Sequence, residues 1–489
     1  MNENTISPRD AQWREDLRKT HTAKERTSIP RVKMTELAPD YRVTCNEEVN
    51  QGLSRDQAVL EATRCLDCPD PQCITGCPVG INIPGFIKNI ERGNLKDAAI
   101  VLKETSALPA VCGRVCPQER QCESKCIYNK MKKPPVAIGY LERFAADSER
   151  LSGDSSLPPR MAANGKKVAV VGSGPAGLSF AGDMARRGYE VHVYEALHEI
   201  GGVLKYGIPE FRLPNEVVDV EIKSLEKSGV KFMTDCVVGK TLSYDDLLDR
   251  GFNGIFVASG AGLPRFMGIE GENLVGVMSS NEYLTRVNLM GAGREGWATP
   301  VIRGKRVAVI GGGNTAMDSC RTARRMGAEE VYIVYRRSEA EMPARVEEVR
   351  HAKEEGVQFL TLNNPVKYLA DEKGRVRAML LQRMELGEPD ASGRRSPVPV
   401  EGDVREVEVD QVIVSVGVSP NPLIPNSIEG LEVTRRGTLA VEEETLRTSI
   451  PLIFAGGDIV RGGATVILAM GDGRKAAAAM DKAISEGTI

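Results

Sequence analysis

The chain has 489 residues, of which 41% are hydrophobic and 27% are charged, and its formal net charge is -3. This length allows two or three domains that each bury a core. No stretch reaches the ~18 apolar residues of a membrane span, the polar start lacks a signal-peptide core, and the net charge does not suit nucleic acid. We therefore expect a cytoplasmic protein that binds neither membrane nor nucleic acid. The Lys- and Arg-rich first 45 residues are interpreted as a docking surface or a solvated tail.

The cysteines are unevenly placed, with eight of the eleven lying between Cys65 and Cys126. Because the cytoplasm keeps thiols reduced, this clustering indicates metal ligation. The two runs are Cys65-x2-Cys68-x4-Cys73-x3-Cys77-Pro78 and Cys112-x3-Cys116-Pro117-x4-Cys122-x3-Cys126. Soft thiolates at these spacings suit iron in two 4Fe-4S clusters, with Cys77 expected to cross over to the second group. Two structural zinc sites are the alternative, although only Cys65 and Cys68 have the zinc-type spacing.

The remaining cysteines, Cys45, Cys236 and Cys320, are isolated and are interpreted as small buried apolar side chains. Only four histidines occur and no G-x-S-x-G motif is present, so a His-based hydrolytic triad has little support. We expect cofactors to carry the chemistry and assign no side chain as a catalytic acid or base.

Three kinds of segment follow one another along the chain. Apolar residues at three- and four-residue spacing predict a helical domain up to about residue 150, and a polar linker is expected over 152–167. A strand, a Gly-rich turn, a helix and a second strand are then predicted over 166–196 and again over 305–338. A third Gly-rich turn precedes a helix over 454–484, which is expected to return and complete the first of these domains.

The first Gly-rich turn carries the dinucleotide-binding pattern, with Gly172, Gly174, Pro175, Ala176 and Gly177. The glycines permit a tight turn and let a pyrophosphate approach the helix N-terminus. Glu195 ends the next strand, where a carboxylate can accept hydrogen bonds from a ribose diol. A turn that serves only strand-to-helix packing is the alternative.

The second turn contains Gly311, Gly312, Gly313, Asn314 and Thr315. The position that corresponds to Glu195 is Arg336, followed by Arg337. A carboxylate there would repel the 2′-phosphate of NADPH, whereas a guanidinium binds it. We therefore expect FAD at the first turn and NADPH at the second, the alternative being two solvated arginines.

Asp458 follows two glycines in the third turn. It is interpreted either as a partner of a flavin ribityl hydroxyl or as a helix N-cap.

Five motifs resemble those of a known family: RCLDCPDPQCITGCPVGINIP with VCGRVCPQERQCESKC, GSGPAGL, GGVLKYGIPEFRLP, GGGNTAMD with YRR, and FAGGDIVRGGATVILAMGDGR. Along essentially its whole length the chain resembles the small (beta) subunit of NADPH-dependent glutamate synthase. It is also similar to the N-terminal part of dihydropyrimidine dehydrogenase and to the large subunit of NADH-dependent ferredoxin:NADP oxidoreductase.

The resemblance implies an α+β multidomain fold. An N-terminal α-helical iron-sulfur domain would precede two Rossmann-like α/β nucleotide-binding domains of the glutathione-reductase type, the second inserted in the first. The implied bounds are 1–155 for the helical domain, 160–295 with 415–489 for the FAD domain, and 296–414 for the NADPH domain. The resemblance also implies which residues lie along the flavin. They are the segment 201–214, with Gly202, Val203 and Arg212, and also Gly457, Asp458, Ala464 and Thr465.

In this family the two clusters draw ligands from both cysteine runs. The resemblance assigns one 4Fe-4S cluster to Cys65, Cys68, Cys73 and Cys126, and the other to Cys77, Cys116 and Cys122. The last ligand of the second cluster is a glutamine in dihydropyrimidine dehydrogenase, and the matching residue here is Glu142. This departure leaves Cys112 as a competing ligand. A carboxylate ligand is expected to lower the potential of that cluster.

The resemblance implies a subunit that transfers hydride from NADPH to FAD and then single electrons through the clusters to a partner. The chain lacks an N-terminal Cys nucleophile, so glutamate formation from glutamine and 2-oxoglutarate would require a large second subunit in a hetero-oligomer. One alternative is an electron-bifurcating ferredoxin:NADP oxidoreductase with a flavin/2Fe-2S partner and ferredoxin as an acceptor. Another is a non-catalytic redox sensor with structural metal sites.

Overall fold

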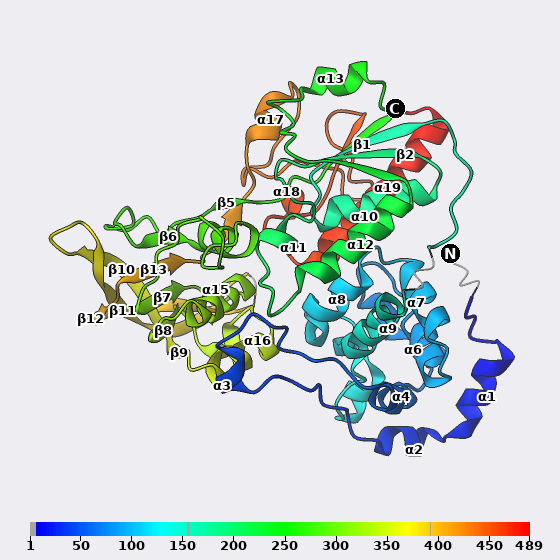
Figure 1. Ribbon diagram of the computed structural model, residues 1–489, viewed down its shortest axis with the longest axis horizontal. Coiled ribbons are helices and arrows are strands. Elements are labelled where there is room, and N and C mark those ends of the chain that lie inside the picture. Colours follow the sequence, from blue (N-terminus) through cyan, green and yellow to red (C-terminus); the bar gives the residue numbers. More distant parts are fainter. Residues whose placement is uncertain (1–5, 154–156, 392) are drawn as a thin grey trace.

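The computed structural model describes residues 6–153, 157–391 and 393–489. It contains a helical N-terminal domain and two α/β domains, each built on a five-stranded sheet (Figure 1). In Figure 1 the helical domain lies below the first α/β domain, and the second α/β domain lies to the left. No helix in the described part of the chain combines the length and apolar character needed to cross a membrane.

The helical domain consists of short helices separated by the loops that carry the cysteines. Side-chain caps begin several of them: the hydroxyl of Ser54 accepts from the Gln57 amide, and the side chain of Asn82 accepts from the Gly85 amide. The helix after Asn82 is buried almost throughout. The helices are α1 (Gln12–Thr20), α2 (Ala23–Ser28), α3 (Pro39–Arg42), α4 (Arg55–Thr63), α5 (Gln72–Thr75), α6 (Ile83–Glu91), α7 (Leu95–Lys103), α8 (Pro109–Val115) and α9 (Ile138–Ser152), with single 3-10 turns at η1 (Gln118–Arg120), η2 (Glu123–Lys125) and η3 (Ile127–Met131).

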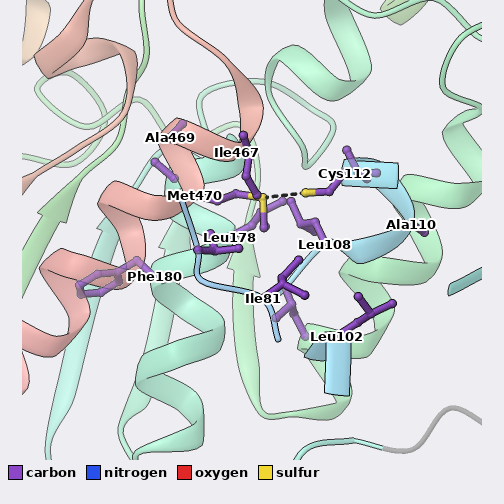
Figure 2. Packing of buried hydrophobic residues seen from close by; sticks show 14 of the residues in the cluster. Ile81, Leu102, Leu108, Ala110, Cys112, Leu178, Phe180, Ile467, Ala469 and Met470 are labelled. Carbon is purple, nitrogen blue, oxygen red and sulfur yellow. Dashed lines mark hydrogen bonds between the residues drawn. The ribbon is translucent and has the colours of Figure 1, made fainter. Parts of the chain in front are cut away.

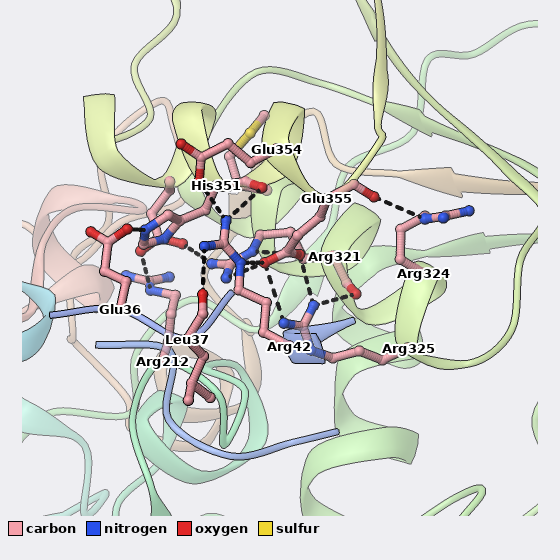
Figure 3. Close-up of polar contacts among 12 residues, drawn as sticks. Glu36, Leu37, Arg42, Arg212, Arg321, Arg324, Arg325, His351, Glu354 and Glu355 are labelled. Carbon is pink, nitrogen blue, oxygen red and sulfur yellow. Dashed lines mark hydrogen bonds and ion pairs between the residues drawn. The ribbon is translucent and has the colours of Figure 1, made fainter. Parts of the chain in front are cut away.

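The basic N-terminal arm packs against the rest of the chain, which corrects its interpretation as a solvated tail. Arg14, Arg26 and Arg42 are buried. Arg42 reaches the second α/β domain, where its Nε donates to Glu355 at 2.8 Å and its Nη2 donates to Glu354 at 2.8 Å (Figure 3). Charge alone could not predict this, because a buried arginine is recognised only through partners that lie far away in the sequence.

The first α/β domain has a parallel sheet in the order β15-β4-β1-β2-β3. Its last strand comes from the end of the chain, where Phe454 lies opposite Phe256. The second domain is therefore inserted in the first, as expected from the sequence. The elements are β1 (Lys167–Val171), α10 (Pro175–Arg186), β2 (Glu190–Tyr194), α11 (Val203–Tyr206), α12 (Asn215–Lys227), β3 (Val230–Met233), α13 (Tyr244–Asp249), β4 (Gly254–Val257), α17 (Leu423–Ser427), β15 (Ile453–Ala455), α18 (Asp458–Arg461) and α19 (Val466–Glu486).

The second α/β domain has a parallel sheet in the order β6-β13-β7-β8-β9, and an antiparallel sheet β10-β11-β12 projects from it at the far left of Figure 1. Strand β6 precedes the expected start of this domain at 296, so the structure moves that boundary toward the N-terminus. Three residues are too short for periodicity to reveal such a strand. The elements are β6 (Val277–Ser279), α14 (Ser280–Leu284), η4 (Thr285–Leu289), β7 (Arg306–Ile310), α15 (Asn314–Arg325), β8 (Glu330–Tyr335), η5 (Glu339–Glu341), α16 (Val346–Glu354), β9 (Gln358–Thr361), β10 (Asn363–Ala370), β11 (Val376–Pro389), β12 (Arg395–Glu408) and β13 (Gln411–Val414).

Two chain segments cross between the α/β domains. They meet as the short antiparallel pair β5 (Leu263–Pro264) and β14 (Val418–Ser419). This crossing places the Gly-rich turns of the two parallel sheets around one common cavity.

Candidate functional site

The Gly-rich turns after β1 and β7 line one continuous cavity of about 1980 Å³. Ordinary ligand sites enclose roughly 300–1,000 Å³, so this cavity has room for two large ligands side by side. It lies at the carboxyl ends of both parallel sheets, where open α/β folds bind nucleotides. Of the nucleotide-site residues expected from the sequence, all except Gly177 line it.

The turn after β1 leaves a space beside Gly174. A Cβ atom on Gly174 would meet no protein atom within 4 Å, whereas one on Gly177 would lie 2.1 Å from the Gly172 carbonyl oxygen. Gly172 itself has φ +102°, which favours glycine. Gly174 therefore fits the close approach of a phosphate group to the start of α10, and Gly177 serves the packing of the turn.

Glu195 is held at the edge of the cavity by three hydrogen bonds. Its Oε2 accepts from the amide of Ser173 at 2.9 Å and from the hydroxyl of Ser173 at 2.5 Å. Its Oε1 accepts from the Leu197 amide at 2.9 Å. The carboxylate is thus fixed in position and faces the same cavity as the turn, which suits recognition of a ribose diol.

The turn after β7 is tied to the segment that follows β8. The amide of Arg345 donates to Asn314 Oδ1 at 2.9 Å, and the amide of Ala344 donates to the Gly312 carbonyl at 3.2 Å. A Cβ atom on Gly313 would meet only Pro343, at 3.9 Å, so this glycine also leaves room for a ligand. Thr315 lines the cavity one residue into α15.

The two consecutive arginines after β8 have different environments. Arg337 is buried, and it donates to Asp390 Oδ2 at 2.5 Å and to the Arg395 carbonyl at 2.7 Å. Arg336 is exposed on the cavity wall and has no hydrogen-bond or ion-pair partner among the residues that the structure describes. Arg336 is therefore the arginine that is free to bind an anionic ligand.

Arg212 lines the cavity, but its charge is engaged within the protein. Its Nη1 donates to both carboxylate oxygens of Asp318, at 2.7 Å each, and its Nε lies 3.4 Å from Glu348. Burial raises the pKa of Asp318 to about 6, although Arg212 opposes this shift. Sequence reasoning missed Asp318, whose only signal was its place in the GGGNTAMD motif.

The side chain of Asp458 makes a hydrogen bond inside the third Gly-rich turn. Its Oδ1 accepts from the Ala464 amide at 3.1 Å, and the N-cap residues of α18 and α19 are Gly457 and Thr465. Asp458 is therefore not a helix N-cap, and one of its two interpretations is excluded. Burial raises its pKa to about 6. Asp472, which the sequence did not reveal, accepts from the Gly457 amide at 2.9 Å and holds this turn in place.

The clustered cysteines fall into two sets. The outer cysteine set is Cys65, Cys68, Cys73 and Cys126, and the inner cysteine set is Cys77, Cys112, Cys116 and Cys122. The pKa of the Cys73 thiol is raised by burial and then by the other three thiols of the outer set. The pKa of the Cys122 thiol is raised by burial and then by several acidic neighbours, including Cys116 and Cys77. The grouping is compatible with the interleaved pattern that the resemblance implied, and the assignment of these residues to two clusters stays a prediction.

Cys112 and Glu142 both remain candidates for the last ligand of the inner set. Cys112 is fully buried, and its Sγ lies 3.4 Å from the Sδ of Met470 on α19 (Figure 2). Glu142 is buried too, and its Oε1 has no hydrogen-bond partner among the described residues. Its pKa is raised to about 8, by burial first and then by Glu221. A buried oxygen without a partner fits a ligand of a bound metal cluster.

The spacing of the thiols argues against zinc. Four sulfurs around a zinc ion, each bonded at about 2.3 Å, would lie ~3.8 Å apart. Among the described residues no three cysteine sulfurs lie within 4.8 Å of one another. Neither set therefore gathers its thiols as closely as a bound zinc ion would.

A different group, Glu36, Glu347 and His351, does bring three ligand atoms within 4.8 Å of one another. Both of its carboxylates are paired with arginines: Glu36 with Arg350 at 2.6 Å, and Glu347 with Arg345 at 3.1 Å. Because these arginines already neutralise the carboxylates, the group joins the N-terminal arm to α16 and does not suit a cation.

Comparisons with known proteins agree with this architecture. Residues 42–153 match a family described as dihydropyrimidine dehydrogenase domain II, 4Fe-4S cluster, and residues 166–481 match the family described as pyridine nucleotide-disulphide oxidoreductase. The NADP(+)-dependent formate dehydrogenase subunit beta of Moorella thermoacetica is 39% identical over 440 residues, which cover 85% of this chain and 60% of that relative. The glutamate synthase [NADPH] small chain of Azospirillum brasilense is 38% identical over 438 residues, which cover 88% of this chain and 90% of that relative.

A solved structure also shares the fold of the two α/β domains. Mycobacterium tuberculosis FprA in complex with NADPH matches with a TM-score of 0.55 and 20% identity, covering 66% of this chain and 85% of that one. Together these matches confirm the expected fold: a helical iron-sulfur domain followed by a two-domain nucleotide-binding oxidoreductase.

Proposed function

The chain belongs to the pyridine nucleotide-disulphide oxidoreductase family, in its glutamate synthase small-chain group, and from this premise we propose that it is the NADPH-oxidising, electron-transferring subunit of a larger enzyme. One observation carries the proposal. Val115 and Pro117, which flank Cys116 of the inner cysteine set, line the same cavity as both Gly-rich turns. The inner cysteine set therefore borders the cavity that holds the nucleotide sites.

Each side of the cavity has residues suited to one dinucleotide. On the first side, the space beside Gly174 takes the pyrophosphate of FAD, Glu195 takes its ribose, and the turn around Asp458 closes over the flavin. On the second side, the space beside Gly313 takes the pyrophosphate of NADPH, and Arg336 takes its 2′-phosphate. When bound, FAD supplies the chemistry that converts a hydride from NADPH into single electrons.

The protein holds the two dinucleotides close to the cysteine sets. The contact between Met470 and Cys112 joins α19, which starts at the cavity, to the inner set. The outer set lies next to the inner one, because Cys73 on α5 is four residues from Cys77, and Cys122 and Cys126 flank η2. The chain thus provides a route from the cavity through the inner set to the outer set.

The final acceptor belongs to a partner. Relatives of nearly equal identity are named for glutamate synthase and for formate dehydrogenase, which indicates that the same module serves different partner subunits. We favour the glutamate synthase type, because that relative is matched over 90% of its length. In this assignment the partner forms glutamate from glutamine and 2-oxoglutarate with the electrons that this chain delivers.

The test is anaerobic purification followed by quantification of iron, sulfide and flavin, and titration with NADPH. Two 4Fe-4S clusters require about eight irons per chain, together with one FAD. Flavin bleaching followed by cluster signals in the EPR spectrum is the expected result. Zinc in place of iron, or a visible spectrum that NADPH leaves unchanged, would refute the proposal. Glutamine-dependent glutamate formation with a large partner would identify the pathway, whereas NADP reduction that needs both ferredoxin and NADH would favour the bifurcating enzyme.

A further inference from the structure

The two cysteine sets differ in their access to solvent. Cys112, Cys116 and Cys122 of the inner set are buried, whereas Cys77 and all four residues of the outer set are partly exposed. The inner set borders the nucleotide cavity, so the outer set is the end of the route that lies nearer to the surface. Given the proposed function, electrons leave the chain at the outer set, and the surface over that set is where an acceptor docks.

That surface carries a concentration of lysines. The lysine face consists of Lys125, Lys130, Lys132 and Lys133, which surround Cys126 in the sequence and are all exposed, together with Met131, which is 44% exposed. No acidic residue occurs between Glu123 and Glu142. Glu123 is itself buried and paired with Arg31 at 2.8 Å, so it does not neutralise the face.

The lysines have few partners within the chain. Lys133 donates to the Thr27 carbonyl at 2.7 Å and keeps its full charge. Lys125, Lys130 and Lys132 make no ion pair with any residue that the structure describes. The chain as a whole has a net charge of -3, so this face has the opposite sign to the molecule that carries it.

The backbone under the lysine face is firmly held. The Tyr128 hydroxyl is buried and donates to the Arg64 carbonyl at 2.6 Å, and the Arg26 carbonyl oxygen lies 3.1 Å from it. The side chain of Asn129 donates to the Glu123 carbonyl at 2.7 Å. The lysines are therefore displayed on a fixed frame beside Cys126, as a docking surface requires.

The other flank of the outer set is also positive. Asp67, next to Cys68, is buried and paired with both Arg14 and Arg18, and Arg9 donates to its carbonyl at 3.2 Å. Two arginines thus pair with this carboxylate, and a third contacts the backbone of the same residue. Asp70 is the exposed acid in this loop, and the side chain of Gln72 donates to it at 2.6 Å.

We propose that the lysine face docks an acidic protein that accepts one electron at a time from the outer set. Opposite charges steer such a partner to the surface beside Cys126 and suppress approach by basic proteins. The balance is one NADPH and two molecules of oxidised acceptor giving NADP+, one proton and two molecules of reduced acceptor. Exposed Met131, which lies between Lys130 and Lys132 in the sequence, supplies an apolar contact.

The experiment uses the full chain with its cofactors and the soluble domain of cytochrome b5, an acidic haem protein, as the probe. A carbodiimide that joins carboxylates to amines is expected to cross-link the probe to Lys125, Lys130 or Lys132, as mapped by mass spectrometry. The dissociation constant is expected to rise steeply between about 10 mM and 150 mM salt, because the screening length falls from ~30 Å to ~8 Å.

Charge reversal tests the residues directly. The double variant Lys130→Glu/Lys132→Glu is expected to weaken cytochrome b5 binding by about tenfold or more and to strengthen binding of basic cytochrome c. The matched control is Lys223→Glu/Lys482→Glu on α12 and α19, which changes the same number of exposed lysines elsewhere. Cross-links that map outside the lysine face, or equal weakening by the two double variants, would overturn the inference.

The two proposals fail in different ways. A chain that NADPH does not reduce would refute the proposed function, whatever the binding result. A chain that NADPH reduces normally but that shows no salt-dependent cytochrome b5 binding would refute the docking surface alone.

Discussion

Arg212 and Asp318 join the two nucleotide-binding domains across the wall of their common cavity. Arg212 belongs to the segment that precedes α12, Asp318 lies on α15, and both hydrogen bonds between them are 2.7 Å long. Arg321 on the same helix pairs with Glu348 and with Glu355. Glu355 also accepts from Arg42 of the N-terminal arm (Figure 3). One buried network therefore fixes all three domains relative to one another.

This network predicts a coupling between Arg212 and Asp318. Arg212→Gln is expected to destabilise the chain by about 3 kcal/mol, because it leaves a buried carboxylate without its main partner. Asp318→Asn is expected to be destabilising for the converse reason. The double variant should cost less than the sum of the two, as measured by denaturant unfolding in a double-mutant cycle. Strictly additive effects would show that the pair does not hold the domains together.

Replacing each of two glycines in the first turn by alanine is expected to have different effects, one on flavin binding and the other on stability. Gly174→Ala should fold normally but lose FAD, since its Cβ atom enters the open space beside the turn. Gly177→Ala should lower the midpoint of thermal unfolding, because its Cβ atom would lie 2.1 Å from the Gly172 carbonyl oxygen. Bound flavin and unfolding midpoint, measured on both variants, separate the two roles. Full flavin content in Gly174→Ala would contradict the assignment of the pyrophosphate site.

The two consecutive arginines after β8 predict a contrast in coenzyme selectivity. Arg336→Ala is expected to raise the KM for NADPH about 10- to 100-fold and to leave the KM for NADH nearly unchanged, because one charge-assisted contact contributes about 1.5–3 kcal/mol. Arg337→Ala removes the bonds to Asp390 and the Arg395 carbonyl, so we expect a loss of stability with little change in the NADPH to NADH preference. Equal loss of both coenzymes in Arg336→Ala would exclude a role in 2′-phosphate recognition.

The local motifs could be predicted because each is short and has its own chemistry. The turn around Gly174, the carboxylate of Glu195 and the cysteine runs are patterns of neighbouring residues whose roles follow from backbone geometry or ligand type. The inserted domain was also predictable, since a third glycine turn at the chain end could pair only with an earlier unit of the same kind.

The contacts between domains could not be predicted. Arg212 meets Asp318 across 106 residues of sequence, and Arg42 meets Glu355 across 313. No local pattern marks these partners, because periodicity and spacing describe one element at a time. The same limit explains why Arg336 and Arg337 were equivalent in the sequence: only the fold shows that the hairpin of β11 and β12 engages one of them.

The raised pKa of Asp458 predicts that the stability of the folded chain depends on pH. Replacing Asp458 by asparagine should remove this dependence. Its pKa is about 6 in the folded chain and 3.8 for an unperturbed carboxyl, so the folded state binds the proton more tightly. The contribution of Asp458 to stability is therefore fully present below pH 4 and is lost as the pH rises through 6. The loss is on the order of 2–3 kcal/mol, since one pKa unit corresponds to about 1.4 kcal/mol.

In the absence of flavin, Asp458→Asn should therefore have a higher midpoint of thermal unfolding than the parent at pH 8, and a smaller advantage at pH 5.5. In a separate binding measurement at pH 8, the variant should bind FAD more weakly than the parent. Asp472→Asn is the matched control. It removes the negative charge that pairs with Arg461 and replaces one of the two oxygens that accept from Arg461 at 2.6 Å by a donor, so it should lower the midpoint at both pH values. Anaerobic thermal unfolding at the two pH values measures the difference. A pH-independent effect of Asp458→Asn would show that burial does not raise the pKa of this carboxyl in the folded chain.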